Sequence, residues 1–216
     1  MAMNILSLYN IALGALGERT LDSTAENRPT RRELDKVNTN GNGYVPTVLH
    51  QGLWNFAITR SSINPSTATP SFGFANSFAL PSDFVRLVNI STSSTMSDPL
   101  LRYEIEGTNI VSDSTILYIR YVSDSTAFGA NLASWPETFT LWVGHWLATQ
   151  VHPTIKEPKV SKADLQALTD RLLTIARQRN AAESAIPFPE RGLTTMEHRE
   201  LDYQVEILTG LPQRQG

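Results

Sequence analysis

The sequence predicts an α+β fold: a bundle of about four to five helices, a small antiparallel β meander and a C-terminal helical arm. Apolar residues recur at helical spacing in the first and last parts of the chain. Four short β-rich runs lie together between them. Segregated strands favour an α+β fold over a parallel sheet. The 216 residues suit one domain with an appendage, and we expect a domain over residues 1–186 and an arm over residues 187–216.

Three helices are expected in the first part of the chain, over residues 4–16, 28–37 and 45–58. Asn4 is a candidate N-cap of the first, and Gly17 is placed to end it. The second begins at Pro29, or at the capping pair Thr30 and Glu33, and ends in the turn "NTNGNG". The third is expected because five apolar residues share one helical face: Val45, Val48, Leu49, Leu53 and Phe56.

The middle of the chain predicts strands. Residues 59–77 are rich in Ser, Thr, Asn and Pro, a composition typical of a connection. Strands are expected over residues 84–91, 100–106, 108–112 and 115–123. Tight turns at Glu106-Gly107 and Asp113-Ser114 indicate a meander in which adjacent strands pair directly.

Helical spacing returns over residues 135–151 and 162–185. Ser134 and Glu137 are in capping-box register for the first of these helices, and His152-Pro153 closes it. Ser161 opens the second. Its apolar positions are expected on one side: Leu165, Leu168, Leu172, Ile175 and Ala176.

Composition excludes several classes of function. The net charge of −3 gives no general cationic field for phosphate backbones. Without cysteine there is no disulfide framework, thiolate nucleophile or Cys-ligated zinc site. No segment reaches the roughly 18 apolar residues of a membrane helix, so we expect no membrane partner. The apolar N-terminus lacks a basic region and is interpreted as structure rather than as a secretion signal.

No motif indicates catalysis, so no catalytic, cofactor-binding or metal-ligating residue is assigned and no cofactor is expected. Phosphate-binding loops, zinc motifs and the nucleophile elbow of serine hydrolases are missing from the sequence. "NTNGNG" has Lys36 and Thr47 where a calcium loop needs carboxylates, so a turn is favoured. Structural roles are favoured for the four histidines: His50, His145, His152 and His198.

Two weak chemical signals keep an alternative open. Glu104 and Glu106 lie two apart on an expected strand, which permits paired-carboxylate chemistry, although an exposed strand face is the favoured interpretation. Arg31 and Arg32 are a dense basic spot, as are Arg177 and Arg179, but nearby carboxylates offset them. The alternative is therefore a nucleic-acid-binding or hydrolytic protein.

Six segments in one order carry a family resemblance that runs from about residue 4 to residue 185. They are "ILSLYNIALGALGE", "LHQGLWNFAITRS", "FALPSDFVRLVNI", "YEIEGTNIVSD", "LYIRYVSD" and "WPETFTLWVGHWLATQVHPTI". The chain resembles the tail tubular protein A, or head-to-tail adaptor, family of short-tailed phages. It departs from that family where "NTNGNGYVP" interrupts the second helix.

The resemblance implies a non-enzymatic structural protein of the virion, present in the host cytoplasm during assembly. Its copies form a ring, usually dodecameric, between the portal protein and the tail nozzle or tail tube protein. Double-stranded DNA passes through the bore without specific binding. A ring of identical subunits needs a head-to-tail interface whose rotation closes on itself.

The C-terminal arm has its own helix signals, with a capping box at Thr194 and Glu197 and a stop at Gly210 and Pro212. Its apolar residues form two stripes, which suits a helix between two surfaces. We expect it to dock on neighbouring subunits or on the portal, the alternative being that it folds back on its own bundle. The expected partner-binding residues are Phe188, Met196, Leu201, Tyr203, Val205, Ile207 and Leu208.

Overall fold

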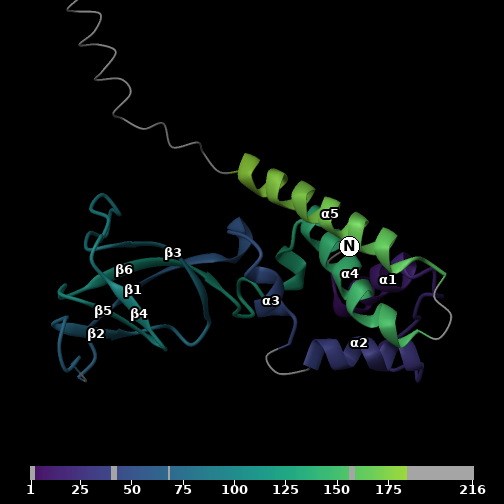
Figure 1. Ribbon diagram of the computed structural model, residues 1–216, viewed down its shortest axis with the longest axis horizontal. Helices are drawn as coiled ribbons and strands as arrows, with labels where there is room; N and C mark the ends of the chain where they lie inside the picture. The colour runs from purple at the N-terminus through teal and green to yellow at the C-terminus, as the bar shows by residue number, and fades with distance from the viewer. Residues whose placement is uncertain (1–2, 40–42, 68, 156–158, 184–216) are drawn as a thin grey trace, which may run out of the picture. The chain divides into compact units, whose positions relative to one another are not determined.

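The computed structural model describes residues 3–39, 43–67, 69–155 and 159–183 (Figure 1). Within these ranges the chain forms five α-helices and two three-stranded antiparallel sheets, which confirms the α+β class. The helices are α1 (Ile5–Ala15), α2 (Pro29–Thr39), α3 (Val45–Leu49), α4 (Glu137–Val151) and α5 (Lys162–Ala182).

Helix α1 begins and ends where its sequence predicts. The Asn4 side chain accepts a hydrogen bond from the Ser7 backbone N–H at 2.8 Å, which satisfies a free donor of the first turn. At the other end Gly17 adopts φ +68°, and the Glu18 N–H donates to the Leu13 carbonyl at 2.8 Å. This is a Schellman motif, in which glycine takes the left-handed position.

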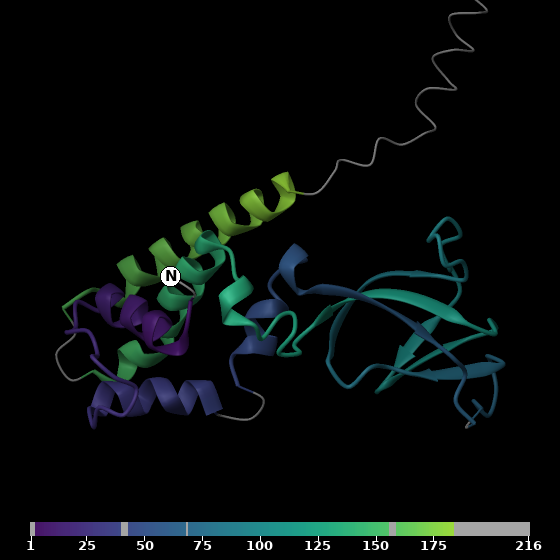
Figure 2. The ribbon, with the colours of Figure 1, turned by 180° about the vertical axis from the view of Figure 1, so that it is seen from behind.

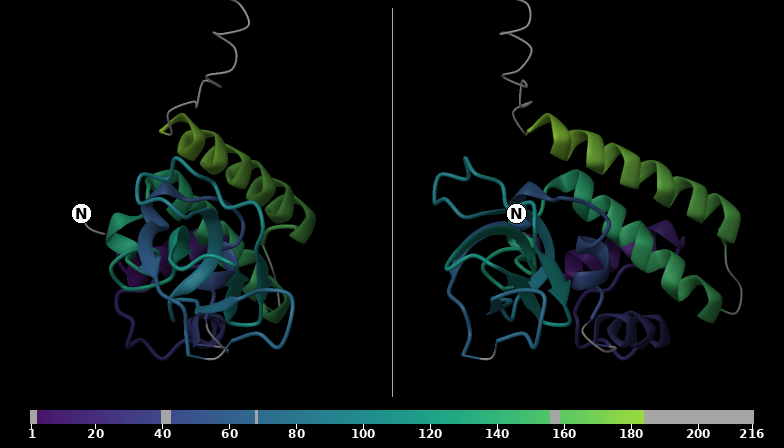
Figure 3. Two further views of the ribbon diagram at one scale, coloured as in Figure 1. Left: turned by 90° about the vertical axis from the view of Figure 1, so that its left-hand side faces the viewer. Right: turned by 60° about the vertical axis from the view of Figure 1, so that its left-hand side comes forward.

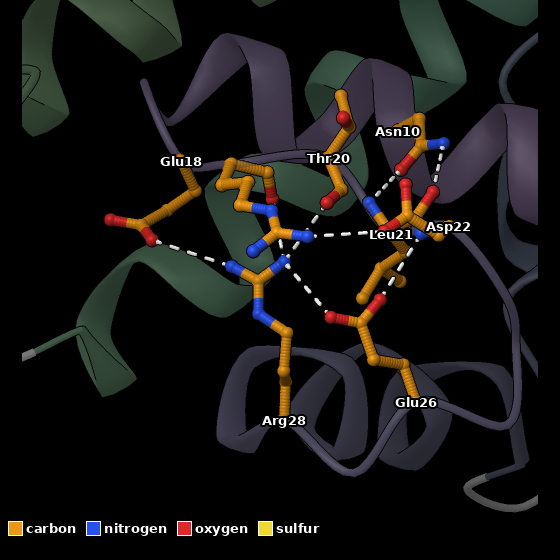
Figure 4. A network of polar contacts seen from close by, with 8 residues as sticks. Asn10, Glu18, Thr20, Leu21, Asp22, Glu26 and Arg28 are labelled. Atoms are coloured by element: carbon orange, nitrogen blue, oxygen red, sulfur yellow. Dashed lines mark hydrogen bonds and ion pairs between the residues drawn. The ribbon is translucent and has the colours of Figure 1, made fainter.

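The connection from α1 to α2 is organised around Arg28 (Figure 4). Its guanidinium donates to the carbonyls of Arg19 at 2.8 Å and Thr20 at 3.1 Å. The carboxylates of Glu18 and Glu26 each lie 4.0 Å from it. Arg28 therefore fixes the start of α2, whose bounds agree with the predicted helix 28–37 to within two residues.

The predicted helix 45–58 is wrong beyond Leu49. Helix α3 ends there, a short 3₁₀ turn follows at Asn55–Ala57, and strand β1 begins at Ile58. Trp54 is buried, and its indole N–H donates to the Val48 carbonyl at 3.3 Å, so the chain folds back on itself. Burial of Trp54 in the core outweighs the local helical spacing.

Six strands form the two sheets. They are β1 (Ile58–Ile63), β2 (Asn76–Ala79), β3 (Phe84–Ser91), β4 (Glu104–Glu106), β5 (Asn109–Ser112) and β6 (Leu117–Ser123). The predicted strand 84–91 is confirmed, and the next three are confirmed with shorter bounds. Two strands, β1 and β2, lie inside the segment predicted as a connection. That prediction is wrong because strand formation there depends on a partner, which β6 and β5 supply.

The strand order also corrects the predicted meander. Sheet A has the order β1-β6-β3 and sheet B the order β2-β5-β4. Among neighbours in sequence only β4 and β5 pair within the described strands, through the predicted turn at Gly107. Strand β3 pairs with β6 instead, placing Leu87 opposite Tyr121 and Ile90 opposite Ile119. The additional strands β1 and β2 complete two sheets where a single one was expected.

Helices α4 and α5 agree with the predicted segments, but one cap differs. Ser134 lies in a 3₁₀ turn, Leu132–Ser134, and its hydroxyl donates to the Asn131 carbonyl at 2.8 Å. Pro136 occupies the N-cap of α4 without a side-chain bond, so the capping-box prediction is wrong. The predicted cap of α5 is confirmed, because Ser161 accepts from the Asp164 N–H at 3.3 Å.

The chain buries two hydrophobic clusters, a larger one mainly from the helices that also includes Val85 of β3 and Val122 of β6, and a smaller one from the strands. Aromatic rings dominate the helical cluster, where the Trp54 ring centroid lies 5.8 Å from Trp142 and 4.7 Å from Phe139. The smaller cluster lies among the strands, around Phe78 and Ile119. Figure 2 shows the same helices and strands from behind. Helix α4 packs against both α1 and α5, and α5 runs alongside it in Figure 3.

No helix in the described part of the chain combines the length and hydropathy that crossing a bilayer requires.

Candidate interaction surface

The partner-binding residues predicted in the arm lie outside the described residues, so their role stays a prediction. They are Phe188, Met196, Leu201, Tyr203, Val205, Ile207 and Leu208. The predicted boundary at residue 186 also lies there. Candidate contact surfaces in the described part are therefore sought among exposed apolar and unpaired charged side chains.

Helix α5 exposes an apolar stripe to solvent. The predicted apolar side divides in two: Leu165 and Ala176 are buried, whereas Leu168 is 44% exposed and Ile175 37% exposed. By their spacing the five residues share one side of the helix, as expected, and that side is only partly buried. Because seven residues bring a helix back to within about 20° of the same direction, Leu168 and Ile175 share one side. We call this pair the α5 stripe.

The last turns of α5 are bonded to the segment that precedes β1. The Asn180 side chain accepts from the Asn55 N–H at 2.8 Å and donates to the Leu53 carbonyl at 2.6 Å. Arg177 donates to the Gln51 carbonyl at 3.0 Å through Nε. These bonds span about half of the chain, and the sequence alone carried no signal for them. They fix the C-terminal end of α5.

A second apolar surface lies on loops of the β region. Phe72 is 89% exposed and Leu101 90% exposed. Arg102, next to Leu101, donates to the carbonyl of Gly73, next to Phe72, at 3.3 Å. Arg102 also forms an ion pair with Asp113 at 2.8 Å. This arrangement holds the two loops together. We call Phe72 and Leu101 the β-loop pair.

The candidate carboxylate pair does not lie in a cavity. Glu104, Ile105 and Glu106 make up the whole of β4, and all three are exposed. Strand β4 is an edge of sheet B, and charged residues on an edge strand discourage pairing with other chains. The geometry agrees with the favoured interpretation of an exposed strand face.

A carboxylate that sequence reasoning missed joins β3 to β6. Asp83 accepts hydrogen bonds from the Tyr121 hydroxyl at 3.1 Å and from the Ser123 hydroxyl. Burial, and then the bond to Asp83, raises the pKa of Tyr121 to about 12. Burial, and then the nearby Asp83 charge, raises the pKa of the Asp124 carboxyl. Ser123 is fully buried and so inaccessible as a nucleophile, which makes this cluster structural.

The described histidines do not form a metal site. His152 is buried, and its Nε2 lies 2.9 Å from the Val160 carbonyl, a structural hydrogen bond as expected. His145 makes a comparable contact within α4, with its Nδ1 2.9 Å from the Leu141 carbonyl. In the described ranges no three His, Cys, Asp or Glu residues gather as metal ligands would. His198 lies outside them.

The basic spot on α2 is largely used inside the protein. Arg31 donates to the Thr24 carbonyl at 3.1 Å and forms an ion pair with Asp35. Asp35 also accepts from the Tyr9 hydroxyl at 3.0 Å, and the pKa of Tyr9 is raised, first by its burial and then by this bond. Arg32 alone of the pair is exposed. This geometry weighs against a nucleic-acid surface built from Arg31 and Arg32.

Comparison with known proteins found no match, either among models of protein families or among curated proteins.

Proposed function

We propose that this chain is a structural subunit of a phage virion, a head-to-tail adaptor whose copies form a ring between the portal and the tail. The ring surrounds the passage through which double-stranded DNA leaves the capsid. Support comes from the six-segment resemblance over residues 4–185 and from the apolar surfaces that the described residues present.

Two of the resembling segments supply the aromatic core. "LHQGLWNFAITRS" contributes Trp54, and "WPETFTLWVGHWLATQVHPTI" contributes Phe139 and Trp142, whose rings contact one another. The resemblance therefore concerns residues that determine the fold. The proposed assembly has to use surfaces outside this core.

The α5 stripe is the observation that carries the proposal. Leu168 and Ile175 are exposed on the same side of α5, and burial against a partner would remove this apolar surface from water. A ring joins two different surfaces of each subunit. The α5 stripe and the β-loop pair are two such surfaces, and apolar side chains contribute most when they are fully buried between partners.

The arm would add contacts to the same assembly. In the sequence it follows α5, where Asn180 is bonded to the segment before β1. A segment that becomes ordered on binding can cover a large surface of its partner. We assign this role to the seven apolar arm residues named above.

The test is to place charge on the α5 stripe. The double variant Leu168→Glu, Ile175→Glu should lose ring formation with the portal, because burying two unpaired carboxylates at an interface is strongly unfavourable. Ala163→Glu is the matched control: it is exposed on the same helix but about 130° away from the stripe. Sedimentation and electron microscopy report the assembly.

Circular dichroism should show an unchanged helical content for both variants. Assembly of the double variant at the wild-type level would remove the α5 stripe from the proposal.

A further inference from the structure

Two arginines that form no ion pair with a described residue lie side by side on sheet A. Arg60 on β1 and Arg120 on β6 stand directly opposite each other in the antiparallel ladder. Like charges in this relation destabilise a sheet unless a counter-charge is present. No carboxylate among the described residues forms an ion pair with either arginine, and the Arg120 Nε is buried without a hydrogen-bond partner.

The neighbour on the other side of Arg120 does not supply an acceptor. Asn89 on β3 is its partner in the ladder, but the Asn89 side-chain oxygen accepts from the Ile90 N–H at 2.8 Å. The positive charge of this row is therefore not compensated within the described part of the sheet. A chain with a net charge of −3 nonetheless places two cations side by side here.

A pocket of about 220 Å³ lies against Arg60. Its lining comes from β1, β6 and the loop after β3, and the lining residues with polar side chains are Arg60, Ser61, Ser62, Ser94 and Tyr118. Within the described chain, Arg60 and the hydroxyls of Ser62, Ser94 and Tyr118 are not bonded to any other group. Four side chains that can donate hydrogen bonds thus line one cavity.

The loop that supplies Ser94 has a defined conformation. The Ser91 hydroxyl donates to the Asp98 carbonyl at 2.7 Å, and the hydroxyls of Ser93 and Thr95 lie 2.8 Å apart. Met96, which also lines the pocket, has a φ of 62°, a conformation that a residue with a Cβ adopts at some energetic cost. The bonds across the loop hold this shape.

We propose that this pocket binds a phosphate group. A guanidinium and hydroxyl groups from three segments suit a ligand that only accepts hydrogen bonds and carries negative charge. A phosphate offers more acceptor oxygens than a carboxylate, and a guanidinium matches its geometry in a bidentate contact. The site goes beyond the adaptor role and does not depend on ring formation. Its phosphate is either a free anion or a phosphodiester of nucleic acid.

Calorimetric titration of the full chain at low salt tests the site with two probes, sodium phosphate and a short DNA duplex. Arg60→Gln should weaken binding about tenfold or more, since it removes a charge-assisted bond. Arg60→Lys should restore part of the affinity because it restores the charge. Arg171→Gln is the matched control, an exposed arginine of α5 without an ion pair among the described residues, and it should bind as wild type.

The pattern of binding identifies the source of the phosphate. Binding of sodium phosphate that Arg60→Gln weakens supports a site for a free anion. Binding of the duplex alone, also weakened by Arg60→Gln, supports a backbone phosphodiester as the ligand. The proposal is overturned if neither probe binds the wild-type chain, or if Arg60→Gln and Arg171→Gln change affinity equally.

Discussion

Asn180 joins two parts of the chain that are separated by about 125 positions. Its side chain bonds to the backbone of the Leu53–Asn55 segment as both donor and acceptor, and its own carbonyl accepts from the Asn55 side chain at 2.9 Å. Such a residue has the same sequence signature as any polar residue on a helix. Its structural effect depends on the fold, which is why only the local caps Asn4, Gly17 and Ser161 were predictable.

We predict that Asn180→Ala lowers the free energy of unfolding by about 1–3 kcal/mol, because it leaves partly buried backbone groups without their partner. Chemical denaturation measures the change. Gln178→Ala, at an exposed position two residues away, should stay within about 0.5 kcal/mol of wild type. Equal effects of the two substitutions would contradict the structural role of Asn180.

The raised pKa of Tyr121 predicts that the folded chain loses stability at alkaline pH. Its pKa in the folded chain is raised to about 12 from the usual value near 10. Its contribution to stability is therefore complete below pH ~10 and is lost as the pH rises toward ~12. The fall in unfolding free energy over this window should be smaller in Tyr121→Phe than in wild type.

Denaturation at several pH values measures this difference. Tyr118→Phe, which removes a hydroxyl that is not bonded to Asp83, should keep the alkaline slope of wild type. If Tyr121→Phe shows the same fall of unfolding free energy with pH as wild type, the raised pKa of Tyr121 does not contribute to alkaline unfolding.

At the scale of helices and strands, the spacing of apolar residues predicted an element well where that element buries a single face. Helix α1 and strand β3 are examples, since each has local signals along its full length. The prediction failed for residues 50–58, where Trp54 is buried from a turn while Leu53, one of the residues at helical spacing, is exposed. Spacing alone also did not show that Leu168 and Ile175 of α5 are exposed, because helical periodicity does not distinguish a core contact from an interface contact.

Helices α1 and α4 approach closely at Gly144. A Cβ added at Gly144 would overlap the Ile11 side chain, whereas one added at Gly14 of α1 would meet nothing within 4 Å. We predict that Gly144→Ala destabilises the protein by about 1–3 kcal/mol through overpacking. Gly14→Ala should instead stabilise it by about 0.5–1 kcal/mol, because alanine favours a helix over glycine.

Thermal and chemical denaturation of both glycine variants provide the comparison. If the two substitutions shift stability in the same direction, the close contact between α1 and α4 is not as described.

At the scale of the whole molecule, the α+β class followed from the order of helical and strand patterns, but the strand pairing did not. Strand β6 forms the centre of sheet A because β1 and β3 pair with its two edges, and β1 comes from a segment of connection-like composition. Register across the sheet brings Arg60 opposite Arg120, 60 positions later in the chain. Pairings between distant segments are properties of the fold, so neither the sheet nor the phosphate pocket could be predicted from local patterns.

The proposed function depends on whether copies of this chain associate with one another around an axis. The α5 stripe and the β-loop pair are two apolar surfaces among the described residues to which we assign this association.

Electron microscopy of the full-length chain mixed with the portal protein tests this claim most directly. The account predicts rotationally symmetric rings on the portal, which disappear with Leu168→Glu, Ile175→Glu and persist with Ala163→Glu. Single particles of one subunit's mass that never join the portal would contradict it.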